Sequence, residues 1–170
     1  IAPVLQRSNP MLIGIPPILG PDLLATLRAM GHGDEIALVD GNYPAQDHAR
    51  RLVRADGHGV LVLMEAILQL LPLDRAVPQA LFRASLNNDP AQAAPIHHAI
   101  DALAARMVPD FAVLPLSGEA LYPRIRAAHT PASFPSCSVT DPKVRSGIVN
   151  VRKSLSSRPT TAASTGRAAK

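Results

Sequence analysis

The 170-residue chain carries 17 Lys and Arg against 13 Asp and Glu, has a calculated pI of about 9.8, and is 47% hydrophobic. Its most apolar stretch, residues 59–73, is interrupted by Glu65 and Gln69, which favours a core helix over a membrane span. The single cysteine, Cys137, excludes an internal disulfide and a cysteine-based metal site, in keeping with a cytoplasmic location.

The basic charge is confined to one end of the sequence. Residues 131–170 contain seven basic residues and one acidic residue, whereas residues 1–130 contain ten basic and twelve acidic residues. The main body is therefore mildly acidic. The basic segment has no aromatic residue other than Phe134, so the composition does not predict specific nucleic-acid recognition.

The first predicted elements are a helix and a strand joined by a short turn. Pro21 suits a first helical turn, the leucines after it share one face, and Gly31 is predicted to supply a left-handed stop. Residues 35–39 are mostly aliphatic and are bounded by glycines, which predicts a buried strand. His32 then precedes this strand, and Asp40 lies at its carboxyl end, where open α/β sheets hold ligands.

Helical and strand-like segments alternate along the rest of the body, which predicts an α/β fold in a single domain. The predicted helices span residues 45–52, 60–71, 95–107 and 119–128, and the predicted strands span residues 53–55, 80–86 and 111–114. Residues 146–151 are a further candidate strand. The segment from residue 131 onward is otherwise rich in Ser, Thr, Pro, Ala and Arg without an amphipathic pattern, so most of it is predicted to be disordered.

Four motifs, in this order, resemble the bacterial L-fucose mutarotase and D-ribose pyranase family, and the fucose branch is the closer match. They are Met11 to Pro17, Gly31 to Ile36, Asp40 to Ala45, and Val53 to Gly57. The resemblance covers about residues 11–130 and implies a three-layer α/β/α sandwich of the family's type. Residues 1–10 are an N-terminal extension outside the family pattern, and residues 131–170 form a divergent basic tail.

The resemblance implies an isomerase that interconverts the anomers of L-fucose or a related monosaccharide without a cofactor or a metal. This reaction removes a proton from the anomeric hydroxyl and delivers one to the ring oxygen. Histidine suits both steps because its ordinary pKa of about 6.5 lets it exchange protons near neutral pH. His32 is therefore predicted to be the catalytic acid and base, which is also the role that the resemblance implies. Its structural alternative is to cap the preceding helix.

Three further residues are predicted to bind the sugar. Asp40 is suited to accept hydrogen bonds from sugar hydroxyls, although it also suits an Asx turn or a helix cap. Tyr122 suits either stacking on a sugar or ordinary packing. Glu119 is assigned as a substitute for a polar or basic residue that the family carries where this chain has Gly118.

Several other polar residues have two interpretations each. Asp34 either orients the catalytic histidine or caps the start of the strand. Arg54 and Asp56 either belong to a recurrent family segment or form an exposed turn. The adjacent His97 and His98 point about 100° apart on a helix, so they are predicted to be a surface pair rather than a metal site.

The resemblance also implies a homo-oligomer, because relatives form ring-shaped homodecamers with sites at subunit contacts. A membrane partner and a specific nucleic-acid partner are not expected. The family's terminal strand, which carries Tyr and Asn, is not found after Thr130. Together with Gly118, this departure supports an alternative hypothesis: a non-catalytic or impaired sugar-binding protein that still forms a ring.

Overall fold

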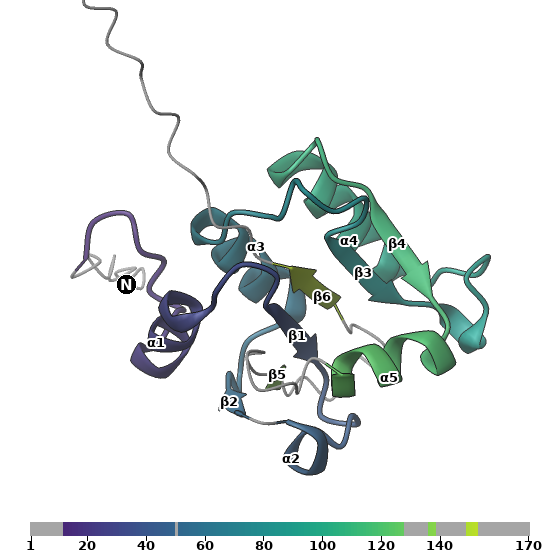
Figure 1. Ribbon diagram of the computed structural model, residues 1–170, viewed down its shortest axis with the longest axis horizontal. Helices are drawn as coiled ribbons and strands as arrows, with labels where there is room; N and C mark the ends of the chain where they lie inside the picture. Colours follow the sequence, from purple (N-terminus) through teal and green to yellow (C-terminus); the bar gives the residue numbers. More distant parts are fainter. Residues whose placement is uncertain (1–11, 50, 128–135, 139–148, 153–170) are drawn as a thin grey trace, which may run out of the picture.

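One mixed sheet organises the protein (Figure 1). The computed structural model describes residues 12–49, 51–127, 136–138 and 149–152. In this part of the chain the strand order is β2-β5-β1-β6-β3-β4. The strands are β1 (Glu35–Val39), β2 (Val53–Arg54), β3 (Leu81–Ala84), β4 (Val113–Leu116), β5 (Ser136–Ser138) and β6 (Val149–Arg152).

Neighbouring strands are parallel except where they meet β6. β1 pairs in parallel with β5, β5 with β2, and β3 with β4. β6 runs antiparallel between β1 and β3, with Val151 opposite Ile36 on one side and Leu81 on the other. Parallel strands require long crossover connections, which helices supply here. The predicted α/β class is confirmed.

Helices pack on both faces of the sheet, as the two hydrophobic cores demonstrate. Ile36 and Leu38 of β1 join a core with buried residues of α1, α3 and α4, whereas Ala37 and Val39 join a second core with residues of α2 and α5. Successive strand side chains point to opposite faces, so β1 contributes to both cores. The helices are α1 (Pro21–Ala29), α2 (Ala45–His48), α3 (Val60–Leu70), α4 (Pro95–Met107) and α5 (Gly118–Ala127), with a 3-10 turn η1 (Leu86–Asn88). The predicted three-layer α/β/α arrangement is therefore confirmed.

The strongest local patterns gave the correct bounds. β1 and α4 coincide with their predicted ranges, and α3 ends one residue earlier than predicted. β4 begins two residues later than predicted because Phe111 belongs to a turn, in which its N–H donates to the carbonyl of Val108 over 2.9 Å. β3 is shorter than predicted because the chain turns at Asn87 and Asn88, whose φ angles of 52° and 63° are left-handed.

Two strands come from the segment after Thr130, and both lie inside the sheet. The candidate strand at residues 146–151 corresponds to β6, displaced slightly toward the C-terminus, whereas β5 was not predicted. Residues 1–10 and most of the tail lie outside the described residues, so the proposed division of the chain stays a prediction. No helix in the described part of the chain is long and apolar enough to cross a membrane.

Candidate functional site

His32 lies in a tight turn between α1 and β1. The Gly31 N–H donates to Asp34 Oδ2 over 2.6 Å, and the Asp34 N–H donates to the Gly31 carbonyl over 3.3 Å. The left-handed residue is Gly33, with φ of 82°, and not Gly31 as predicted. The reason is that α1 already ends at Ala29: the residue after it, Met30, has an extended ψ of 132°, and the left-handed residue comes only after His32. Asp34 thus holds together the turn that carries the imidazole.

The imidazole of His32 faces a buried carboxylate. Its Nε2 lies 3.6 Å from Asp74 Oδ2, and the two side chains are 49% and 0% exposed, respectively. This separation is longer than a hydrogen bond, so the contact is electrostatic and strengthens when the imidazole is protonated. A half-exposed imidazole over a buried carboxylate is an arrangement suited to accept and return a proton at the protein surface.

Asp74 is the site residue that sequence reasoning missed. It lies in the loop after α3, where its Oδ1 accepts the N–H of Ala76 over 2.9 Å. The sequence feature that could have identified it is its position directly after the apolar residues Leu71, Pro72 and Leu73. An acid in such surroundings is predicted to be buried, and buried acids are rare unless they are paired. Nothing in that local pattern indicated His32 as its partner.

Asp40 lies at the other end of β1 from His32. The strand between them has five residues, which at about 3.3 Å per residue corresponds to a backbone span of roughly 16 Å. Asp40 is buried, and its Oδ1 accepts the N–H of Asn42 over 3.0 Å, so it does form the Asx turn that was its structural alternative. Within one chain, β1 therefore keeps Asp40 and His32 apart.

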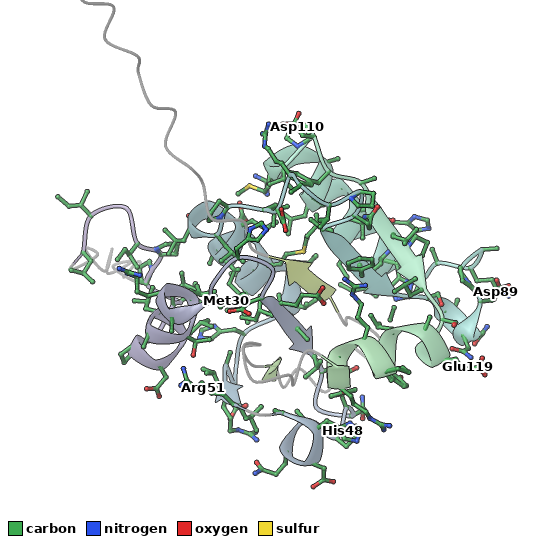
Figure 2. All side chains as sticks on the ribbon, viewed as in Figure 1. Met30, His48, Arg51, Asp89, Asp110 and Glu119 are labelled. Carbon is green, nitrogen blue, oxygen red and sulfur yellow. The ribbon has the colours of Figure 1, made fainter. Side chains whose placement is uncertain are left out.

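An aromatic cluster lies next to Asp40. The hydroxyl of Tyr43 is 3.3 Å from Nδ1 of His48 (Figure 2). The ring of Tyr43 also lies near that of Tyr122, with 5.7 Å between the two centroids. Burial raises the pKa of Tyr43, an effect that the positive charge of Arg126 partly offsets. Tyr122 packs against Tyr43 and remains 43% exposed, so it has both the packing role and a free surface.

Glu119 is exposed in the first turn of α5 (Figure 2). The N–H of Gly118 donates to Oδ1 of Asn88. A Cβ atom at position 118 would lie 3.1 Å from that oxygen and 3.1 Å from the ring of Tyr122. Asn88 and Tyr122 therefore crowd the space in which a larger side chain at position 118 would begin.

The remaining polar candidates have structural roles. Arg54 and Asp56 form a surface ion pair of 2.9 Å, which agrees with the exposed-turn interpretation. His98 is exposed, but the prediction that His97 also lies on the surface is wrong. His97 is fully buried, and its Nδ1 accepts the N–H of Ala94 at the start of α4 over 3.1 Å. Among the described residues, no three His, Cys, Asp or Glu side chains converge as metal ligands would.

Sequence comparison connects these features to known proteins. The model of the RbsD / FucU transport protein family matches residues 13–131 of the chain. The chain is 51% identical over 70 residues to the fucose mutarotase of Bos taurus, a match that covers 39% of this chain and 46% of the bovine protein. The chain thus spans about half the length of the curated relatives it matches.

Structural comparison extends over more of the chain. The crystal structure of fucose mutarotase from Streptococcus pneumoniae in complex with L-fucose has a TM-score of 0.66 and 29% identity, covering 85% of this chain and 99% of that protein. The crystal structure of FucU from Bifidobacterium longum has a TM-score of 0.71 and 28% identity, covering 84% of this chain and 99% of that protein. Both share the sheet and helix layers described above.

Proposed function

The chain belongs to the RbsD / FucU transport protein family, and we propose that it is an isomerase, a cofactor-free mutarotase for L-fucose or a related monosaccharide. Membership confirms the family resemblance of the four sequence motifs. Relatives of the chain include proteins named fucose mutarotase. The observation that carries the proposal is the pairing of half-exposed His32 with buried Asp74.

The proposed mechanism uses the pair for two successive proton transfers. The neutral imidazole of His32 removes the proton from the anomeric hydroxyl, and the carboxylate of Asp74 stabilises the imidazolium that forms. The imidazolium then protonates the ring oxygen as the bond between that oxygen and the anomeric carbon breaks. After the aldehyde rotates, the steps run in reverse and the ring closes on the other face. Each proton taken up is returned, so the histidine is regenerated.

The proposed sugar site is completed between subunits. Asp40 and Tyr122 are proposed to bind the sugar, with Glu119 at the margin of the site, yet β1 separates Asp40 from His32 within one chain. A ring in which the His32 end of one subunit faces the Asp40 end of its neighbour brings both groups to one sugar. We therefore include a closed homo-oligomeric ring, of ten subunits as in relatives, and a cytoplasmic location in the proposal.

The experiment that tests this function measures anomer exchange by saturation-transfer NMR on L-fucose, D-ribose, D-galactose and D-glucose. His32→Ala is expected to reduce catalysed exchange by about 10²- to 10⁴-fold, because it removes the proton carrier. His98→Ala is the matched control, since it removes an exposed histidine from α4 and is expected to leave exchange unchanged. Undiminished exchange in a folded His32→Ala variant would reject the assignment.

A second candidate function is sugar binding without catalysis. It is favoured by Gly118, which provides no polar side chain at the start of α5. The same NMR samples separate the two functions. Saturation transfer from protein to sugar without faster anomer exchange identifies a binding protein, whereas faster exchange identifies the mutarotase.

A further inference from the structure

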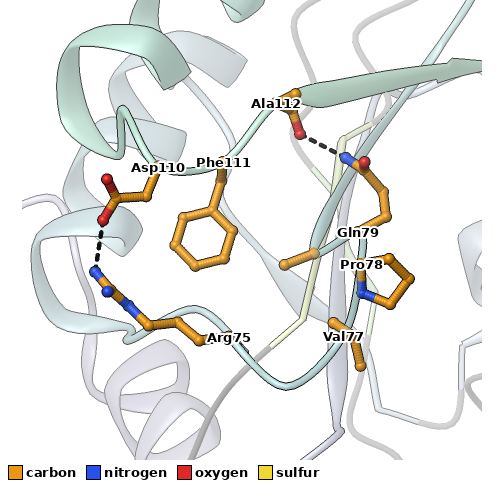
Figure 3. Close-up of a pocket in the computed structure, with 8 residues that line it drawn as sticks. Arg75, Val77, Pro78, Gln79, Asp110, Phe111 and Ala112 are labelled. Atoms are coloured by element: carbon orange, nitrogen blue, oxygen red, sulfur yellow. Dashed lines mark hydrogen bonds and ion pairs between the residues drawn. The ribbon is translucent and has the colours of Figure 1, made fainter.

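A cavity of about 410 Å³ has none of the residues predicted for the mutarotase site in its lining (Figure 3). It opens between the segment that precedes β3 and the segment that precedes β4. Its lining includes Arg75, Val77, Pro78 and Gln79 from the first segment, and Asp110 and Phe111 from the second. Ligand pockets in proteins span roughly 300–1,000 Å³, so this volume suits one small molecule.

The rim of the cavity carries one positive and one negative group. Arg75 Nη2 donates to Asp110 Oδ2 over 2.7 Å, and the two side chains are 75% and 63% exposed. Figure 3 shows this pair at one side of the cavity. A guanidinium has five N–H donors and a carboxylate has two acceptor oxygens, so both groups keep capacity for a ligand in the cavity. Among the residues that the structure describes, no other charged side chain lines the cavity, so the charges of these two groups balance.

Part of the cavity lining is apolar and aromatic. The ring of Phe111 lies beneath the guanidinium of Arg75, with 5.9 Å between the guanidinium carbon and the ring centroid. Val77 and Pro78 add aliphatic surface (Figure 3). An aromatic face carries partial negative charge, so it favours contact with polarised C–H groups.

Gln79 holds the two walls in place. Its side-chain amide donates to the carbonyl of Leu81 in β3 over 2.7 Å and to the carbonyl of Ala112, which precedes β4. One side chain therefore ties the starts of two neighbouring strands. A cavity whose walls are fixed before binding loses less conformational entropy when a ligand enters.

We propose that this cavity is an accessory binding site for a neutral sugar ring. A pyranose offers a C–H face to Phe111 and hydroxyl groups that both donate and accept hydrogen bonds at the rim. The balanced rim disfavours charged relatives because its two groups lie 2.7 Å apart: a sugar phosphate bound at Arg75 also meets Asp110, and an amino sugar bound at Asp110 also meets Arg75. Arg75 directly follows Asp74, the residue that faces His32. A ligand in the cavity therefore lies next to the loop that carries Asp74.

The test uses methyl glycosides, which cannot open their rings, so it does not depend on the proposed mutarotase activity. Binding of methyl α-L-fucopyranoside and methyl α-D-galactopyranoside to the full chain is titrated by saturation-transfer difference NMR. Arg75→Gln and Asp110→Asn are each expected to weaken binding by about tenfold or more, because each removes a charge-assisted hydrogen bond. Phe111→Leu is expected to weaken binding while keeping apolar volume.

Two control variants sharpen the result. Arg106→Gln removes an exposed arginine from another surface ion pair, that with Glu65, and is expected to bind the glycosides as the wild type does. His32→Ala is expected to retain binding in the cavity although it loses anomer exchange. Thermal unfolding establishes that each variant is folded.

The proposal is overturned if neither glycoside binds the wild-type chain, or if Arg75→Gln and Asp110→Asn bind as tightly as Arg106→Gln. Preferential binding of inorganic phosphate at this cavity would also overturn it, since the rim would then select an anion. Absence of anomer exchange with intact, Arg75-dependent glycoside binding would reject the proposed function alone.

Discussion

Tyr43 shows how one buried polar residue couples the fold to pH. Its ring belongs to the smaller hydrophobic core, and its hydroxyl lies 3.3 Å from His48 Nδ1. Burial is the main cause of its raised pKa. The folded protein therefore holds the phenol proton to a higher pH than the unfolded chain, whose tyrosines titrate near 10. The stability linked to Tyr43 is fully present below about pH 10 and is lost as the pH rises through the pKa of the folded state.

Tyr43→Phe is expected to lose less stability than the wild type between about pH 9 and pH 11, because the variant has no buried phenol to ionise. The measurement is the free energy of unfolding in urea as a function of pH. His48→Ala is the control, since it removes the neighbouring imidazole but keeps the buried phenol, and it should retain the alkaline loss. Equal alkaline losses in Tyr43→Phe and the wild type would contradict this account.

Among the secondary-structure elements, α5 has polar contacts with the sheet through Arg124, in addition to its apolar packing in the second core. Both Nε and Nη2 of Arg124 donate to the carboxylate of Glu35 at the start of β1, over 3.1 and 2.5 Å. The same guanidinium lies over Phe82 of β3, with 3.7 Å between its carbon and the ring centroid. Glu35 is only 11% exposed and Arg124 is 31% exposed, so solvent screens this pair less than it screens a surface pair. α5 is thus attached to two strands at once.

Arg124→Ala is expected to reduce the free energy of unfolding by about 2 kcal/mol, because it removes a bidentate partner from a partly buried carboxylate and a cation from an aromatic face. Arg126→Ala removes an exposed arginine from the same helix and is expected to change stability by no more than about 0.5 kcal/mol. Chemical denaturation of both variants measures the difference. Equal effects would show that α5 is held by its apolar face alone.

The complete sheet depends on a segment that composition alone assigned to a tail. β6 joins β1 to β3, and β5 joins β1 to β2. Without these two strands, the described part of the sheet would separate into a β3-β4 pair and two isolated strands. The main-chain groups of β1 would then face no partner along either edge.

Truncation after Thr130 is therefore expected to abolish cooperative thermal unfolding, because it removes β5 and β6. Truncation after Arg152 keeps both strands and is expected to unfold near the midpoint of the full chain. Calorimetry of the two truncations, compared with the full chain, measures the contribution of residues 131–152. If both truncations unfold like the full chain, those residues do not contribute to stability and the composition-based interpretation was sufficient.

The proposed ring predicts recovery of activity in mixed assemblies. Co-expressed His32→Ala and Asp40→Asn chains are expected to regain roughly a quarter of wild-type exchange, since random mixing leaves about a quarter of shared sites with both residues intact. A mixture of His32→Ala and Asp74→Asn is the control and is expected to stay inactive, because these two residues contact each other within one chain. Lack of recovery in the first mixture, or sedimentation of the wild type as a monomer, would reject a shared site.

The elements whose patterns are local could be predicted from the sequence. β1 and α4 have their predicted bounds because hydrophobic periodicity, glycine and proline act over a few residues. The same reasoning correctly placed His32 before β1 and Asp40 after it. It also identified the family, because the motifs that carry the resemblance are short and contiguous.

Contacts between residues far apart in the chain could not be predicted in this way, because they depend on how the elements pack. The contact between His32 and Asp74 joins a turn before β1 to a loop after α3, and the burial of His97 depends on how α4 packs. β6 is an interior strand because its main-chain groups pair with the edges of both β1 and β3. The composition of the segment that contains β6 predicts little burial. Such contacts depend on the burial and hydrogen bonding of segments far apart in the chain, which no local pattern encodes.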